Sequence, residues 1–176
     1  MPTQPRAERP AMPAGYLAEK RRAWPWAEAR LLRSRNYWVA TTTKGGQPHA
    51  RPVWGVWHDG AFFFSSGSKI RENLERGSGI SVNLESGDEC VIFEGVASPL
   101  EDLDVVKVVT SLYNGKYQWN LEPKPGEFFL VRPRVVFGWL CDPSGSDGGA
   151  LFSQTATRWV FPSAPGQGRL APMRDR

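Results

Sequence analysis

An Asp-Gly dipeptide at residues 59–60, flanked by two apolar and aromatic runs, constrains the fold of this chain more than any other feature. The runs at residues 48–58 and 61–66 contain the β-branched and aromatic residues that favour strands. Asp-Gly tolerates the positive φ angles that a two-residue hairpin turn needs. The two runs therefore predict an antiparallel hairpin.

Further short extended segments surround this hairpin, and turn residues separate them. The pattern predicts strands over residues 37–43, 80–85, 90–97, 127–132, 135–140 and 157–161. Apolar residues at helical spacing predict helices over residues 25–34, 69–76 and 100–113. The stripe expected to face the core in the third helix comprises Leu103, Val106, Val109 and Leu112. Strands joined mostly by hairpins predict a mainly β fold, a closed or nearly closed antiparallel barrel with peripheral helices.

The composition is that of a globular chain with one domain. Apolar residues make up 40% of the 176 residues and aromatic residues 12%, which suffices for a hydrophobic core. Composition predicts a disordered tail over residues 1–15, a barrel domain over 16–161 and a C-terminal tail over 162–176. No apolar run is long enough to span a membrane and the first residues lack an apolar signal core, so the expected compartment is the cytoplasm.

The net charge of +4 is concentrated near the N-terminus. Residues 1–35 hold eight Lys or Arg and three Asp or Glu, whereas the remainder holds 14 basic and 15 acidic residues. A nucleic-acid-binding barrel needs a basic face on the folded domain, so this function is the least favoured. The two histidines and two cysteines lack the spacing of a zinc site, so no metal site is expected.

The segment after the hairpin carries the clearest chemical pattern. A strand ends in Ser65 and Ser66, and a short helix opens at Ser68 with Lys69 and Arg71 in its first turn. The start of a helix offers unpaired N–H groups and the positive end of its dipole, and Lys and Arg attract phosphate oxygens. The pattern indicates a phosphate-binding turn, with helix capping by Ser68 as the simpler alternative.

The first strand of the hairpin adds a surface beside this turn. Pro52 cannot donate a ladder hydrogen bond, so this part of the strand is expected at a sheet edge or a bulge. Gly55 marks the close approach of a ligand or of another backbone segment. Strand alternation places Val53 and Trp54 on opposite faces. A flat aromatic ligand would fit along this strand with its phosphate at Lys69, although core packing explains the tryptophans equally well.

Motifs of other enzyme classes are absent from the sequence. There is no GxGxxG after a strand, no GxxxxGK[ST] and no GxSxG. Packing or surface roles are expected for His49 and His58 rather than a catalytic triad. The acids at 101, 102 and 104 are explained by the start of a helix. No catalytic side chain is assigned.

The order of these segments resembles the flavin-binding split β-barrel superfamily, the pyridoxamine 5′-phosphate oxidase-like proteins. The resemblance is carried in order by residues 37–41, 46–54, 64–74, 81–85 and 94–97, and it extends over roughly residues 24–161. Within this superfamily the chain is most similar to the branch of deazaflavin (coenzyme F420)-dependent reductases. The substrate motif of the true oxidases is not recognisable, so vitamin B6 oxidation is not expected.

The resemblance implies a homodimer with two cofactor sites at the subunit interface, which bind coenzyme F420 or, as the alternative, FMN. The positions that match the phosphate-binding motif are Ser65, Ser66, Ser68, Lys69, Arg71 and, more weakly, Asn73. The positions that match the strand flanking the ring system are Pro52, Val53 and Trp54. Residues 153–159 resemble a C-terminal motif that often reaches the partner subunit's site, which makes Arg158 and Trp159 candidates.

The implied function is that of an oxidoreductase that transfers a hydride between the bound cofactor and a small organic substrate. The cofactor carries this chemistry, so no acid or base is required from the protein. Tyr113, Tyr117 and Arg158 are candidate proton donors, with structural roles as the alternative. The longer anionic tail of F420 would use extra cations, for which the basic residues 20–35 are candidates. The alternative is a non-catalytic protein that binds flavin, deazaflavin or haem.

Overall fold

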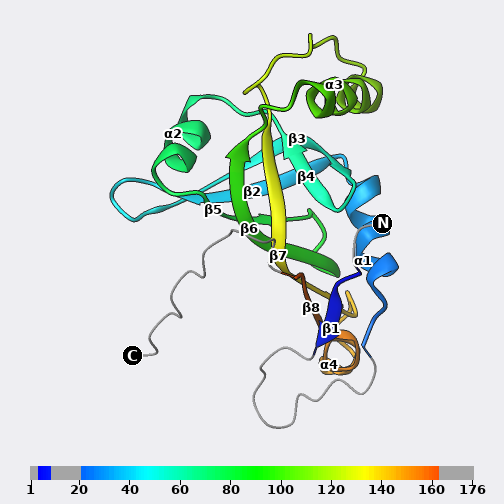
Figure 1. Ribbon diagram of the computed structural model, residues 1–176. Helices are drawn as coiled ribbons and strands as arrows, with labels where there is room; N and C mark the ends of the chain where they lie inside the picture. The colour runs from blue at the N-terminus through cyan, green and yellow to red at the C-terminus, as the bar shows by residue number, and fades with distance from the viewer. Residues whose placement is uncertain (1–3, 9–20, 163–176) are drawn as a thin grey trace.

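The computed structural model describes residues 4–8 and 21–162, and within them antiparallel strands form one sheet that closes into a six-stranded barrel (Figure 1). The strands are β1 (Arg6–Glu8), β2 (Asn36–Thr42), β3 (Pro48–His58), β4 (Ala61–Phe64), β5 (Gly79–Asn83), β6 (Glu89–Pro99), β7 (Phe129–Leu140) and β8 (Thr157–Val160). The helices are α1 (Trp24–Arg33), α2 (Ser68–Arg76), α3 (Leu103–Tyr117) and α4 (Ala150–Thr155). No helix among the described residues is long and apolar enough to cross a membrane.

A pairing between β6 and β7 closes the barrel. The sheet order is β1-β8-β7-β4-β3-β2-β5-β6, and β6 pairs back with β7 from Glu89 opposite Leu140 to Pro99 opposite Phe129. Strands β8 and β1 extend the sheet beyond the barrel. The structure confirms the predicted mainly β fold, an antiparallel split barrel with peripheral helices.

The two strands predicted on either side of Pro133 are one strand, β7. The register between β6 and β7 shifts by one residue, which leaves Arg134 without a partner on β6. Such a bulge tolerates a proline inside a sheet, because the missing N–H is then not required by the ladder. Gly95, opposite Pro133, has no room for a side chain, since a Cβ atom there would lie 2.4 Å from the carbonyl oxygen of Arg132.

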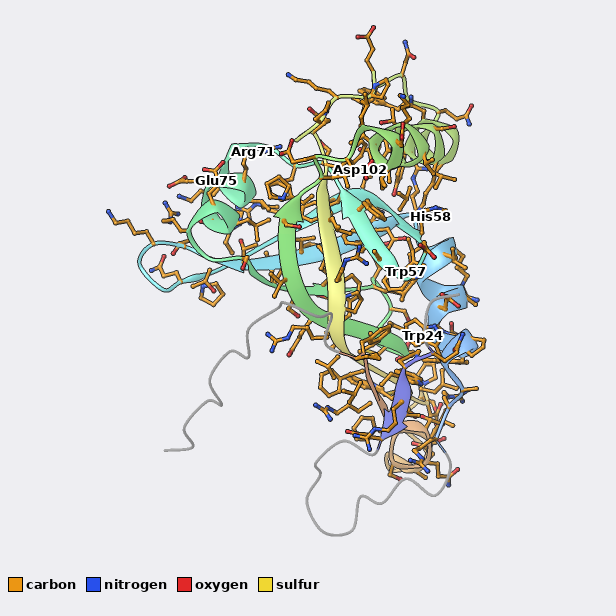
Figure 2. The ribbon with its side chains drawn as sticks, in the orientation of Figure 1. Trp24, Trp57, His58, Arg71, Glu75 and Asp102 are labelled. Carbon is orange, nitrogen blue, oxygen red and sulfur yellow. The ribbon has the colours of Figure 1, made fainter. Side chains whose placement is uncertain are left out.

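Aromatic side chains fill the interior of the barrel. The largest fully buried ones in this core are Trp159, Tyr37, Phe62, Phe64 and Phe93. Helix α1 packs on the barrel through Trp24, whose ring centroid lies 6.1 Å from that of Trp57 on β3 (Figure 2). A second apolar cluster lies between the sheet and α3, so α3 is held on the outside of the barrel wall (Figure 1).

Helix α3 buries a different face from the predicted stripe. Leu103 and Leu112 are 46% and 41% exposed, although Val106 and Val109 are buried as expected. Tyr113 and Tyr117 are buried in place of the two leucines. The larger rings bury more apolar area, and the Tyr117 hydroxyl finds backbone partners, so they decide the orientation of the helix.

Two elements were not anticipated by the sequence pattern. Strand β1 lies in the predicted disordered segment and pairs antiparallel with β8, with Glu8 opposite Arg158. Helix α4 begins after Asp147, whose carboxylate accepts hydrogen bonds from the N–H groups of Gly149 and Leu151. Residues 9–15 and 163–176 lie outside the described residues, so the predicted domain boundaries stay predictions.

Candidate functional site

Strand β4 ends at the serine-rich turn that leads into α2. The N-cap of α2 is Gly67 rather than Ser68, whose side chain lies outside the described residues. Among the described side chains, none accepts a hydrogen bond from the first N–H groups of α2. They carry the positive end of the helix dipole, so the end of β4 presents a surface that suits an anion.

Lys69 adds a full positive charge beside these N–H groups. It is exposed, and its Nζ atom lies 3.2 Å from Oε2 of Glu72. Hydrogen bonds from Arg76 and Lys69 hold the pKa of the Glu72 carboxyl below its usual value. Exposed ion pairs of this kind are weak, so a phosphate could compete for the Lys69 ammonium group.

Arg71 is anchored to the segment that precedes β7 (Figure 2). Its Nη2 atom donates to the carbonyl oxygens of Gly126 at 3.1 Å and Glu127 at 3.5 Å. Its guanidinium carbon lies 4.8 Å from the centre of the Phe129 ring. Ser65 also contacts this segment, because its hydroxyl donates to Oε1 of Glu127 at 2.8 Å. These contacts fix the two side chains but leave Arg71 further N–H donors.

Asn73 lies inside the protein rather than at the turn. Its side chain is 1% exposed, and its Nδ2 atom donates to Oγ1 of Thr41 on β2 at 2.9 Å. Its Oδ1 atom accepts a hydrogen bond from Arg76 at 3.1 Å. Because both ends of the amide are used within the chain, Asn73 ties α2 to β2.

The strand β3 presents the other predicted contacts. Pro52 is exposed and pairs only with Trp38 of β2, since β4 begins to pair with β3 at Gly55. This confirms the expected sheet edge. Val53 is buried in the barrel, whereas Trp54 lies on the outer face, as alternation predicted. The close approach at Gly55 is that of the Phe62 ring, because a Cβ atom would lie 2.4 Å from its Cε2 atom.

The surroundings of Trp54 were missed by sequence reasoning. The Trp54 ring stacks on Tyr117 with centroids 4.6 Å apart and 4° between the planes, and the Trp119 ring meets it edge-on at 5.8 Å. The guanidinium carbon of Arg35 lies 5.6 Å from the centres of the Trp54 and Tyr117 rings. We call Trp54, Tyr117 and Trp119 the aromatic shelf. The run of aromatic residues at positions 113, 117 and 119 was its only sequence signal.

Lys116 lies behind the aromatic shelf. Its Nζ atom donates to the carbonyl oxygen of Gly55 at 2.8 Å and to the Tyr37 hydroxyl at 3.0 Å. Burial, aided by the charge of Arg35, lowers the pKa of Lys116 to about 8. Burial also raises the pKa of Tyr37 and that of Tyr117, the latter to about 12.

The candidate proton donors have structural contacts. The Tyr117 hydroxyl accepts a hydrogen bond from the Gly55 N–H at 2.8 Å and lies 2.6 Å from the Arg35 carbonyl oxygen. Tyr113 is buried, and its pKa is raised by that burial. Arg158 forms an ion pair with Glu8 at 2.5 Å. These contacts favour the structural alternative for all three residues.

A single chain does not bring Arg158 and Trp159 to the turn at α2. In Figure 1, β8 lies at the lower end of the barrel and α2 at its upper left. Trp159 is fully buried, with its ring centroid 5.9 Å from that of Trp24. Its side chain is therefore part of the core of its own subunit.

The cations of α1 are engaged within the chain. Arg30 and Arg33 both pair with Glu89, at 2.9 and 2.7 Å. Arg22 and Arg30 also lie over the Trp26 ring, at 4.8 and 3.9 Å from its centre. These contacts reduce the charge that this region offers to a cofactor tail. In the described part of the chain, no three His, Cys, Asp or Glu side chains gather in a way that would hold a metal ion.

Comparisons with known proteins agree with this architecture. A family model described as pyridoxamine 5′-phosphate oxidase matches residues 25–140. General stress protein 26 from Bacillus anthracis str. Sterne superposes with a TM-score of 0.54 at 18% identity, over 65% of this chain and 91% of that one. An F420 reductase superposes with a TM-score of 0.50 at 18% identity, over 62% and 94%.

A heme binding protein from Mycobacterium smegmatis gives a TM-score of 0.54 at 20% identity, over 66% of this chain and 54% of that one. At these identities the structural likeness concerns the fold alone. No curated protein sequence matches this chain. The family model covers well over half of the chain, and the barrel that it spans is the one described above. The chain therefore belongs to the pyridoxamine 5′-phosphate oxidase family.

Proposed function

We propose that this protein is an oxidoreductase that binds coenzyme F420, or alternatively FMN, and transfers a hydride between this cofactor and a small organic substrate. The start of α2 beside Lys69, where no described side chain caps the helix, is the observation that carries the proposal. Both cofactors combine a flat ring system with a phosphate. A phosphate fits this turn, because N–H groups, a helix dipole and an ammonium group converge on it. The F420 reductase among the structural relatives favours the deazaflavin.

In this proposal the turn before α2 binds the phosphate of the cofactor, and β3 contacts its ring system. Lys69 and the first N–H groups of α2 would hold the phosphate, with the hydroxyl of the half-buried Ser66 as a further donor. Arg71 keeps the turn next to the segment before β7 through its two carbonyl contacts. The exposed edge of β3 at Pro52 leaves backbone open for a flat ring. When bound, the cofactor would supply the hydride chemistry.

The outer face of the barrel supports a homodimer with the site at its interface. The outward-facing residues around Trp38 come from three neighbouring strands: Pro52 and Ala50 on β3, Ala40 on β2, and Asn83 and Ser81 on β5. None of these residues is charged, and Trp38 is 39% exposed. An exposed patch without charge is typical of a protein interface.

Pro52 belongs both to this patch and to the candidate site, so a dimer formed here would place a second subunit beside the cofactor. Arg158 faces outward on β8, opposite Phe137, and is paired with Glu8 in its own subunit. In such a dimer it would exchange this pair for the cofactor of the partner subunit, whereas Trp159 would support it from within the core.

Steady-state turnover tests the catalytic proposal. The protein is mixed with reduced F420 or reduced FMN and a panel of enones and quinones, and cofactor oxidation is followed by absorbance. Turnover above that of the free cofactor supports the oxidoreductase. Tight binding of a cofactor without turnover on any substrate would favour the alternative, a protein that holds flavin, deazaflavin or haem, as the heme binding protein of the same fold does.

A further inference from the structure

The aromatic shelf is held rigidly at the protein surface. Trp119 is 56% exposed, yet its backbone N–H donates to the Asn114 carbonyl oxygen at 3.1 Å. The Asn114 side chain closes the same turn, since it exchanges two hydrogen bonds of 2.9 Å with the backbone of Leu121. The Trp119 ring is further supported edge-on by Trp54. An exposed tryptophan held in this way offers a flat apolar surface at little cost in conformational entropy.

The charge beside the aromatic shelf is positive. The exposed Arg35 lies over the shelf and takes part in no ion pair among the residues that the structure describes. By contrast, Arg33, two positions earlier, is paired with Glu89. The ammonium group of Lys116 lies behind the same rings, 5.3 Å from the centre of Tyr117. A guanidinium next to stacked rings can bind a carboxylate in a bidentate manner while the rings hold a flat body.

The aromatic shelf is continuous with the strand expected to flank the cofactor ring. Trp54 follows Val53 directly on β3 and lies on the outer face, two residues from the exposed Pro52. A substrate that accepts a hydride has to lie beside the cofactor ring, and the exposed ring of Trp119, edge-on to Trp54, offers an apolar surface near this position on β3.

We infer that the aromatic shelf and Arg35 bind the substrate of the reaction, and that this substrate is a planar conjugated molecule with a carboxylate group. This inference rests on the proposed function for its reaction, but not for the binding itself. The rings of Trp54 and Trp119 contact the flat body of the substrate, and Arg35 binds its carboxylate. A neutral molecule lacks the contact with Arg35, and a non-planar molecule lacks the contact with the two tryptophan rings.

Isothermal titration calorimetry of the full chain without cofactor tests the inference with 2-naphthoate as the probe. Two matched compounds separate the contributions: 2-naphthamide keeps the ring system without the charge, and cyclohexanecarboxylate keeps the charge without the flat ring. We expect 2-naphthoate to bind about tenfold tighter than either. Equal binding of the three compounds, or no binding of 2-naphthoate at millimolar concentration, would overturn the inference.

Substitutions at Arg35 and Trp119, with Arg33 as a control, test which residues bind 2-naphthoate. Arg35→Gln should remove the preference for 2-naphthoate over 2-naphthamide, whereas Arg33→Gln, a matched change on an arginine paired elsewhere, should leave it intact. Trp119→Leu should weaken both aromatic compounds about tenfold. If Arg35→Gln keeps the full preference, the carboxylate is bound elsewhere and the inference fails.

Titration with F420 and FMN distinguishes this failure from that of the proposed function. Arg35→Gln and Trp119→Leu should bind FMN, which lacks the anionic tail of F420, within about twofold of the unsubstituted protein, because neither residue belongs to the turn at α2. A protein that binds a cofactor but does not select 2-naphthoate would contradict the inference about the shelf and leave the proposed function standing. A protein that selects 2-naphthoate but binds neither cofactor supports the shelf and contradicts the proposed function.

Discussion

The Nζ atom of Lys116 lies 3.0 Å from the Tyr37 hydroxyl, so a lysine near the end of α3 meets a buried tyrosine at the start of β2. The same atom binds the Gly55 carbonyl oxygen on β3. One side chain thus joins a helix to two barrel strands behind the aromatic shelf. Its charge is partly removed from water, and this makes the stability of the fold depend on pH.

The contribution of Lys116 to stability should rise between pH 8 and 10.5. Its pKa is about 8 in the folded protein against 10.5 for an ordinary lysine, so the unfolded chain binds more protons in this window. The cost of holding a charged Lys116 in the fold is present below pH 8 and disappears as the pH rises. After allowance for solvent screening, the effect is on the order of 1 kcal/mol.

Urea unfolding of the protein and of Lys116→Met at several pH values measures this effect. From pH 8 to 10, the free energy of unfolding of the unsubstituted protein should increase relative to that of Lys116→Met. The titration of the tyrosines affects both proteins alike, so it cancels in this comparison. A difference that is independent of pH would show that Lys116 titrates normally.

Gly55→Ala should destabilise the barrel by about 2 kcal/mol or more, because the new Cβ atom would lie 2.4 Å from the Phe62 ring and 2.7 Å from the Phe63 carbonyl oxygen. Both neighbours are fixed by the β3–β4 pairing. Gly45→Ala is the matched control, since nothing lies within 4 Å of its added atom. Thermal and urea unfolding of both variants check this, and equal stability would mean that β3 can shift to accept a side chain.

Lys69→Ala should weaken cofactor binding about tenfold without changing the melting temperature. The reason is that the exposed ammonium group contributes to phosphate binding, while its contact with Glu72 contributes little to stability. Lys107→Ala is the control, because Lys107 forms a similar exposed pair with Asp104 on α3. Affinities from fluorescence titration that are unchanged in Lys69→Ala would remove this residue from the site.

Trp38→Glu should convert the proposed homodimer to a monomer, because it places a charge in the middle of the uncharged patch formed by Pro52, Ala50, Ala40, Asn83 and Ser81. Leu32→Glu alters an even more exposed residue, at 56%, on α1, and should leave the dimer intact. Light scattering coupled to gel filtration gives the mass of each protein. A monomeric unsubstituted protein, or a dimer that survives Trp38→Glu, would place the interface elsewhere or exclude it.

The barrel could be predicted from the sequence because hairpin signals are local. Asp59 and Gly60 form the predicted turn, with positive φ angles of 47° and 72°. Asp102 caps α3 by accepting hydrogen bonds from the N–H groups of Asp104 and Val105, as the acids at this helix start indicated. These features depend on residues a few positions apart, so pattern and propensity suffice to find them.

Contacts between distant segments could not be predicted in this way. The continuity of β7 through Pro133 depends on a bulge against Gly95 of another strand. Strand β1 depends on its pairing with β8, which lies about 150 positions later in the chain. The exposed face of α3 was misassigned because Leu112 and Tyr113 are equally apolar by pattern, and only the position of β3 decides which is buried.

The turn before α2 could be predicted from the sequence, whereas its role in binding stays a prediction. The turn at residues 65–69 leads into a helix that begins at Ser68, next to the predicted start at Lys69. Trp159 and Asn73 instead fill the core of their own subunit, and no single-sequence pattern distinguishes a buried polar amide from a binding one. The aromatic shelf joins residues 54 and 117 from a strand and a helix, so it was visible only in the fold.

The first experiment is a titration of the purified apoprotein with F420 and with FMN, followed by absorbance and gel filtration. We expect saturable binding of one cofactor, F420 ahead of FMN, at one site per subunit, with the cofactor absorbance eluting at the mass of the dimer. Tighter binding of FMN would reverse the order of the two cofactors. Binding of neither would contradict the phosphate-binding role of the turn at α2, and with it the proposed oxidoreductase.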